Sequence, residues 1–183
     1  MTAAVVPAPR AEFSIGAFWL KFLLLQGALF ITELLQPVQQ HVIVPFNHGL
    51  AQLSAVIMQL FDSSVYARDA IIWNNNSHFG IEILAGCNAV EASILLISAI
   101  IAFPASLGYK LKGLLVGVVA LHSVNLLRII SLFYLGQWSD QAFQWAHLYV
   151  WQALILLDAV VVWLWWIHRV PSAAKPQASR SRG

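Results

Sequence analysis

The sequence contains little charge and a single cysteine. Only 10% of its 183 residues are charged, 60% are hydrophobic, and the mean hydropathy is +0.73. Soluble domains usually carry about 25% charged residues, so this composition excludes an ordinary soluble protein and indicates an integral membrane protein. One cysteine excludes an internal disulfide. The net charge of +2 is small and its basic residues lie near predicted helix ends, so we expect no nucleic-acid partner.

The long apolar runs predict an all-α polytopic membrane protein with about four transmembrane helices. A helix needs about 20 residues to cross about 30 Å of hydrocarbon. A further stretch, 50–61, has helical periodicity but is too short to cross, so we expect a short interfacial or re-entrant helix there. The four predicted spans are 15–35, 89–103, 111–135 and 147–167.

The distribution of lysine and arginine predicts the orientation of these spans. Arg10 precedes the first span, Lys110 and Lys112 lie between the second and third, and Arg169 follows the fourth. Cytoplasmic segments carry an excess of basic residues, so both termini are expected in the cytoplasm. The sequence then divides into a cytoplasmic N-terminal tail (1–14), a membrane-embedded domain (15–169) and a disordered basic cytoplasmic tail (170–183).

Two segments, 36–88 and 136–146, are then expected on the outer face of the membrane. Within the first, the turn-rich run Asn74 to Ser77 separates two stretches of apolar and β-branched residues. This pattern predicts a hairpin, which would deliver the chain to Cys87 at the start of the second span.

Three chemically capable residues are predicted to share this outer face. Arg128 lies about seven residues before the end of its span, about 10 Å beneath that end. Cys87 directly precedes the second span, and His147 opens the fourth. A helix N-terminus, a guanidinium and an imidazole each stabilise a thiolate or accept the proton of a thiol. The set predicts acyl transfer, with Cys87 as nucleophile, His147 as base and Arg128 as the group that holds an oxyanion, a carbonyl or a carboxylate.

Each of these residues also has a structural interpretation. A lone membrane cysteine is often a small inert hydrophobic residue. An arginine near a helix end can extend to the lipid headgroups, and His147 has the aromatic neighbours typical of an interfacial belt. The shared face and depth of the three residues favour the catalytic interpretation.

Other polar residues are assigned supporting roles. Glu91 lies one turn beyond Cys87 and is expected to pair with Arg128, while Asn125 is placed to form a hydrogen bond between helices. His122 and Asp158 are expected to form a buried structural pair, with a proton relay as the alternative. No residue cluster has metal-ligand spacing and no glycine-rich phosphate loop is present, so no cofactor is implied.

Three stretches resemble the exosortase/archaeosortase family, most closely exosortase H. They are "GCNAVEASILLISAIIAFPA", "NLLRIISLFYLG" and "WAHLYVWQ", within a resemblance that extends over about 18–166. The resemblance implies the nucleophile role for Cys87, with Arg128 and His147 as its partners. It also implies substrate proteins that carry a C-terminal motif, a transmembrane helix and a basic tail. Many relatives have glycine two residues after the cysteine, whereas this chain has Ala89. A positive φ would strain alanine, so we expect either a helical residue or a different loop there.

The sequence therefore predicts a sortase-like cysteine protease or transpeptidase of the bacterial inner membrane. It would process the C-terminal sorting signal of exported proteins at the periplasmic face, in contact with membrane lipids and without a cofactor. Small residues at Gly113 and Gly117 offer either a docking strip for the substrate helix or internal packing. The alternative function is a non-catalytic membrane assembly or transport-associated protein with an incidental cysteine.

Overall fold

A computed structural model describes residues 14–170 of the chain. Apart from Ser14 and Val170, the two predicted tails lie outside the described residues. Within residues 14–170 the protein is mostly helical, with three helices long and apolar enough to cross a membrane, a shorter apolar helix and a three-stranded antiparallel sheet. This confirms the predicted fold class, an all-α polytopic membrane protein with a short extra helix and an outer hairpin.

The first span is followed by a second helical segment that runs back toward the rest of the molecule. Helix α1 (Ile15–Leu34) begins where the Ser14 hydroxyl accepts a hydrogen bond from the Ala17 amide at 3.3 Å. The chain then changes direction, and Pro37 lies in the first turn of the next helix, α2 (Gln36–Val38). Helical structure continues through the π-helix η1 (Gln39–Ile43) and α3 (Val44–Gln59). The short helix predicted at 50–61 is therefore present but begins earlier in the chain.

The strands β1 (Val65–Arg68), β2 (Ile71–Asn74) and β3 (Gly80–Glu82) form a sheet in the order β1-β2-β3. The predicted turn joins β2 to β3, where the Asn74 side-chain oxygen accepts hydrogen bonds from the amides of Asn76 (2.8 Å) and Ser77 (3.0 Å). The hairpin prediction is confirmed, and β1 extends it to three strands.

Helix α4 (Val90–Ala102) follows the turn that contains Cys87. Its 13 residues rise only about 20 Å, so it is shorter than the hydrocarbon is thick. Helix α5 (Leu107–Trp138) has 32 residues and rises about 48 Å, so it extends beyond the hydrocarbon by about 18 Å. This long helix carries Arg128.

The segment 136–146, predicted to connect two spans, is almost entirely helical, because only Ser139 separates α5 from the next helix. There α6 (Asp140–Trp145), the π-helix η2 (Ala146–Val150) and α7 (Trp151–Arg169) form one continuous helical stretch of 30 residues. The Ser139 hydroxyl accepts a hydrogen bond from the Ala142 amide at 3.3 Å, and Asp140 lies in the first turn. These residues favour a helix start at Asp140, seven residues before the start of the predicted span 147–167.

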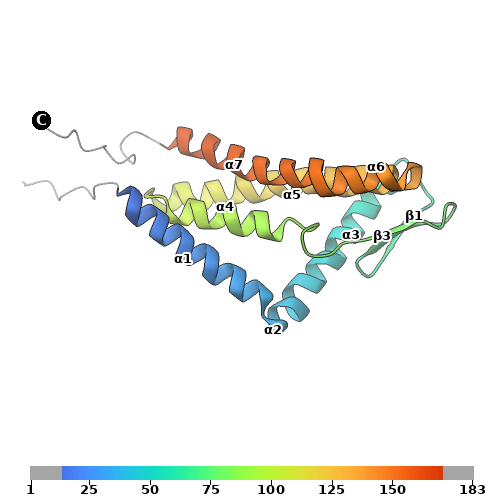
Figure 1. Ribbon diagram of the computed structural model, residues 1–183, viewed down its shortest axis with the longest axis horizontal. Helices are drawn as coiled ribbons and strands as arrows, with labels where there is room; N and C mark the ends of the chain where they lie inside the picture. Colours follow the sequence, from blue (N-terminus) through green and yellow to red (C-terminus); the bar gives the residue numbers. More distant parts are fainter. Residues whose placement is uncertain (1–13, 171–183) are drawn as a thin grey trace, which may run out of the picture.

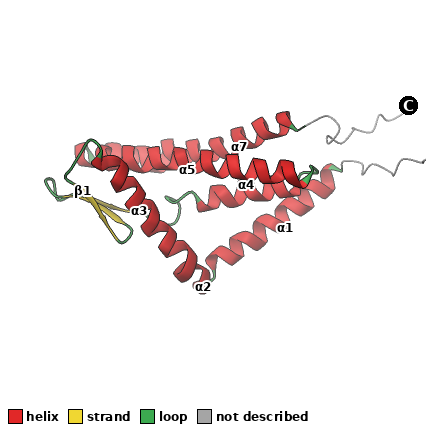
Figure 2. Cartoon of the chain, turned by 180° about the vertical axis from the view of Figure 1, so that it is seen from behind, coloured by secondary structure: helices red, strands yellow, loops and turns green. Residues whose placement is uncertain are grey.

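Helices α5 and α7 pack together along the length of the molecule, the shorter α4 packs against both over part of it, and α1 lies against α4 (Figure 1). Helices α1 and α3 diverge from their junction at α2, and α3 returns to the sheet and to α5 (Figures 1 and 2). The start of α1 and the end of α7 lie at one end of the molecule, whereas α6 and the sheet lie at the other (Figure 1).

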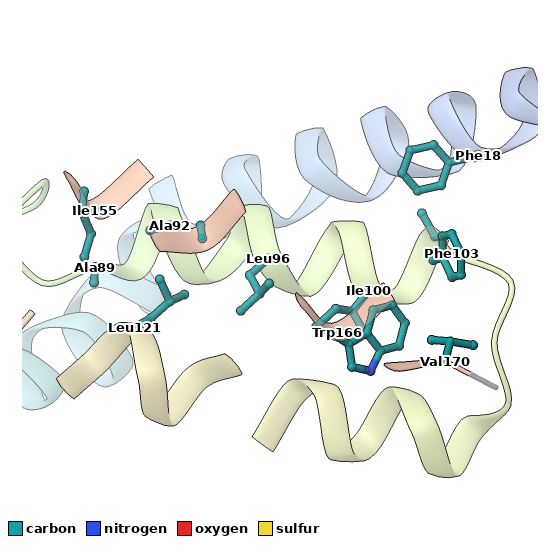
Figure 3. Packing of buried hydrophobic residues seen from close by; sticks show 12 residues of the cluster. Phe18, Ala89, Ala92, Leu96, Ile100, Phe103, Leu121, Ile155, Trp166 and Val170 are labelled. Atoms are coloured by element: carbon teal, nitrogen blue, oxygen red, sulfur yellow. The ribbon is translucent and has the colours of Figure 1, made fainter. Parts of the chain in front are cut away.

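Two apolar clusters hold these parts together. The first joins α1, α4, α5 and α7, where Leu96 and Ile100 of α4 lie near Leu121 of α5 and Trp166 of α7 (Figure 3). The second joins α3, the sheet and the C-terminal half of α5, and Cys87 packs against it. The turn that carries Cys87 thus lies at the boundary between the two clusters.

The glycines of α5 serve internal packing and not a docking strip for a substrate helix. Both Gly113 and Gly117 are buried. A Cβ atom at Gly113 would meet the Trp166 indole, and one at Gly117 would meet the Leu96 side chain at 2.5 Å. The glycines let α7 and α4 pack close to this face of α5, so no room remains there for a substrate helix.

Candidate active site

Cys87 lies in a tight turn that two residues of positive φ define. Gly86 has φ +80° and Ala89 has φ 60°, and the Cys87 amide donates to the Leu84 carbonyl at 3.0 Å. Neither alternative expected for Ala89 is found: it is not helical, and it keeps the left-handed conformation that suits glycine. Buried at 3% exposure, its methyl group is held in place by the first cluster.

His147 faces the thiol directly. Its Nε2 atom lies 3.0 Å from Cys87 Sγ, and its ring stacks on Phe143 with centroids 5.5 Å apart. His147 does not open the last helix as predicted, because it lies within the π-helical turn η2, seven residues after Asp140. Such π turns widen a helix by one residue and are frequent at functional sites.

Arg128 approaches the same turn from α5. It is 1% exposed, its Nη1 atom donates to the Gly86 carbonyl at 3.0 Å, and its Nη2 atom lies 4.0 Å from Cys87 Sγ. Arg128 is 21 residues after Leu107, which corresponds to a rise of about 32 Å along α5. Arg128 lies ten residues, a rise of about 15 Å, before Trp138, the last residue of α5.

Glu91 and Arg128 bind the same residue from opposite sides. The Glu91 carboxylate accepts a hydrogen bond from the Gly86 amide at 2.9 Å, while Arg128 binds the Gly86 carbonyl. The expected direct ion pair is not found among residues 14–170. The two charges instead fix the peptide groups on either side of Gly86, directly before the thiol.

The remaining predicted residues are not joined to this site by hydrogen bonds. Asn125 is fully buried, and its side-chain amide has no partner within the described part of the chain. The predicted His122–Asp158 pair is wrong: His122 Nε2 lies 3.4 Å from the Ser93 hydroxyl, its ring packs edge-on against Phe46, and Asp158 Oδ2 has no partner among the described residues.

Two asparagines beside the thiol were missed by the sequence interpretation. Asn88 is fully buried, and its side-chain nitrogen donates to Asn47 of α3 at 2.9 Å. The available signal was the position of Asn47 on the same helical stripe as the apolar residues of α3. A contact 41 residues away in the chain has no local signature, so the pair itself could not be predicted.

Burial and charge act on the thiol in opposite directions. Burial raises the pKa of Cys87, and this effect exceeds the lowering by the nearby Arg128 charge. A raised pKa favours the protonated thiol, and the imidazole at 3.0 Å is placed to remove its proton when it reacts.

Two hollows in the described part of the chain lie apart from these residues. One of about 460 Å³ lies on the sheet between Arg68, Trp73 and His78. Another, of about 240 Å³, is an apolar groove between α1, α4 and α7. Within residues 14–170, no group of three histidine, cysteine or acidic side chains could hold a metal ion.

Comparison with known proteins places this geometry in a family. No curated protein and no solved structure gives a significant match. The family model for transmembrane exosortase (Exosortase_EpsH) matches residues 13–165, which is most of the chain and includes Cys87, Arg128 and His147. Members of this family are generally cysteine transpeptidases. The chain is a multi-pass membrane protein that belongs to the transmembrane exosortase family.

Proposed function

We propose that the protein is a cysteine peptidase or transpeptidase that cleaves the sorting signal of exported proteins, with Cys87 as nucleophile. The observation that carries the proposal is the 3.0 Å contact between Cys87 Sγ and His147 Nε2, with Arg128 Nη2 4.0 Å from the sulfur. Three segments far apart in the sequence supply these groups. An inert thiol has no need of a base and a cation at these distances.

The first half-reaction follows from this arrangement. His147 Nε2 takes the proton of the Cys87 thiol, and the sulfur attacks the carbonyl carbon of the scissile peptide bond. Arg128 carries a permanent charge beside the sulfur and stabilises the oxyanion that forms. When the C–N bond breaks, His147 returns the proton to the leaving amine, and the new carboxyl end remains on Cys87 as a thioester.

The second half-reaction releases this thioester. Water or an amine gives a proton to His147 and attacks the thioester carbonyl, and the C–S bond breaks. The sulfur recovers its proton from His147. Water as the acceptor yields hydrolysis, and an amine yields a transferred protein with a new amide bond.

The distribution of charge supports a periplasmic active site. Lys110 and Lys112 lie at the start of α5 and Arg169 at the end of α7, whereas Arg128 lies far along α5 beside Cys87. Basic ends favour the cytoplasm, so the thiol faces the periplasm of a bacterial inner membrane. A substrate would present a short motif there, followed by its own transmembrane helix and a basic cytoplasmic tail. Membrane lipids and the enzyme would surround the transmembrane helix.

Replacement of the chromosomal gene tests the proposal. In cells that carry Cys87→Ala, exported proteins with one C-terminal transmembrane helix and a basic tail should retain that tail, and wild-type cells should remove it. Mass spectrometry of C-terminal peptides from membrane fractions measures the difference, with immunoblots to show equal enzyme abundance. Normal processing in the variant would contradict the proposal and favour the alternative, a non-catalytic membrane assembly or transport-associated protein with an incidental cysteine.

A further inference from the structure

The residue after the nucleophile is held from another helix. The Asn88 side-chain nitrogen donates to Asn47 Oδ1 at 2.9 Å, and its side-chain oxygen accepts from the Val90 amide at 3.1 Å. Asn88 is fully buried and Asn47 is 7% exposed. One carboxamide therefore connects α3 to the first residue of α4, and both of its ends are satisfied within the protein.

This connection bears on the position of the thiol. Cys87 lies directly before Asn88, and the turn around it contains two residues of positive φ, Gly86 and Ala89. Arg128 and Glu91 hold the peptide groups of Gly86. The turn is thus fixed on one side by α5 and α4 and on the other by α3.

Helix α3 is a firm support for this contact. Its buried face contacts the sheet and α5, and Asn47 is the polar residue at the start of that face. Phe46 packs edge-on against His122 of α5 with ring centroids 5.4 Å apart, which fixes the same end of α3. The remaining buried residues of this face are Leu50, Ala51, Ser54, Ala55 and Met58.

We infer that Asn47 is a positioning residue, which acts through Asn88 to keep Cys87 Sγ within reach of His147. The effect on catalysis rests on the proposed function. The effect on the position of the thiol rests on the contacts of Asn88. It assigns to α3, which lies outside the predicted spans, the task of aligning the nucleophile. Misplacement of a reacting atom by about 1 Å can cost about 100-fold in rate.

Matched substitutions in α3 test the inference. Asn47→Ala removes the acceptor for Asn88, whereas Asn47→Asp keeps an oxygen in the same place. Gln59→Ala is the control, because Gln59 also uses a carboxamide on α3 for one hydrogen bond, to the Val65 carbonyl at 2.8 Å, without contact to the turn. We expect Asn47→Ala to lower kcat for cleavage of a sorting-tail reporter about 10- to 100-fold, with KM nearly unchanged. Asn47→Asp and Gln59→Ala should each stay within about threefold of the wild-type kcat.

A second measurement needs no substrate. The pH dependence of Cys87 alkylation by iodoacetamide, followed by intact mass in detergent, reports the surroundings of the thiol. In Asn47→Ala the released turn exposes the thiol, so the midpoint should fall toward the ordinary value of about 8.5 and labelling should accelerate. Gln59→Ala should keep the wild-type midpoint. If Asn47→Ala does not accumulate in the membrane, the milder Asn47→Ser takes its place with the same expectation.

The outcomes separate this inference from the proposed function. An unchanged alkylation midpoint in Asn47→Ala, or an equal change in Gln59→Ala, would overturn the positioning role. A kcat loss that Asn47→Asp does not restore would also overturn it. If the wild-type enzyme cleaves no reporter but Asn47→Ala still shifts the midpoint, the proposed function fails and the positioning of the thiol stands.

Discussion

Burial disfavours ionisation of the Cys87 thiol, while His147 lies beside it as a base. Burial raises the pKa of the thiol and the Arg128 charge lowers it, with burial the larger effect. The raised pKa favours the protonated thiol, and His147 at 3.0 Å is placed to accept its proton. A raised pKa limits reaction of the Cys87 thiol with other electrophiles, because the thiolate is the reactive form.

Removal of the guanidinium should move the titration of Cys87 in a defined direction. Because the Arg128 charge lowers the pKa of Cys87, Arg128→Gln should raise it, and the midpoint of iodoacetamide labelling should rise. At a fixed pH below that midpoint the variant should label more slowly than the wild type. Arg128→Lys keeps the charge and should show a smaller rise. A midpoint that falls in Arg128→Gln would contradict this electrostatic account.

The backbone of the turn gives a prediction about stability. A Cβ at Gly86 would meet no atom within 4 Å, so Gly86→Ala adds only the cost of positive φ, about 1–2 kcal/mol. Ala89→Gly relieves the same kind of strain but loses a buried methyl worth about 0.8 kcal/mol, so its net effect should be within about 1 kcal/mol. Thermal unfolding in detergent compares the two variants. Equal stability of Gly86→Ala and wild type would contradict the positive φ at Gly86.

At the scale of elements, the widened turn η2 decides where His147 points. A π turn contains one residue more than the α-helical path, so residues on its two sides differ in phase by about 100° from a regular helix. Helix α7 is fixed by Ile155, Ala159 and Trp166 in the first cluster. The phase between these residues and His147 therefore sets the approach of the imidazole to Cys87.

Deletion of Leu148 tests this role of the π turn. Leu148 is 56% exposed, so its loss removes little packing, yet it restores α-helical phase between His147 and α7. We expect normal accumulation in the membrane and a loss of cleavage of at least about 100-fold. The substitution Leu148→Ala is the control, because it removes the side chain and keeps the phase, and it should retain activity. Full activity of the deletion variant would show that the π turn does not position His147.

At the scale of the whole molecule, apolar runs predicted the spans well and helix ends poorly. Hydropathy predicted α1 within one residue, because lipid-exposed helices must be apolar throughout. It missed the last residues of α5 and all of α6, where polar residues such as Gln137 and Asp140 interrupt the apolar pattern. Helix-start signals at Ser139 and Asp140 were present but were not weighed against the apolar pattern.

The sequence predicted which residues form the site but not how they are arranged. Cys87, Arg128 and His147 were identified from their depth and chemistry, and their distances were not available from the sequence. The contacts of Gly86 and Asn88 depend on side chains up to 42 residues away, which no local pattern records. The raised pKa of Cys87 was missed because burial follows from packing between the two clusters.

The orientation of the molecule gives a further prediction. Because Cys87 is the only cysteine, Cys87→Ala supplies a cysteine-free background. Ser77→Cys, in the turn between β2 and β3, should react with a membrane-impermeant maleimide in sealed spheroplasts. Ser106→Cys, between α4 and α5, should react only after permeabilisation, because Lys110 and Lys112 place that end in the cytoplasm. The opposite pattern would contradict a periplasmic active site.

The most direct test of the central claim is a search for the thioester on Cys87. Wild-type enzyme would be quenched in acid from cells that make its substrates, and the peptide that contains Cys87 would be weighed before and after hydroxylamine. The account predicts an added acyl group on Cys87 that hydroxylamine removes and that is absent in His147→Ala. Continued processing of sorting tails in Cys87→Ala, with no such adduct in the wild type, would contradict it.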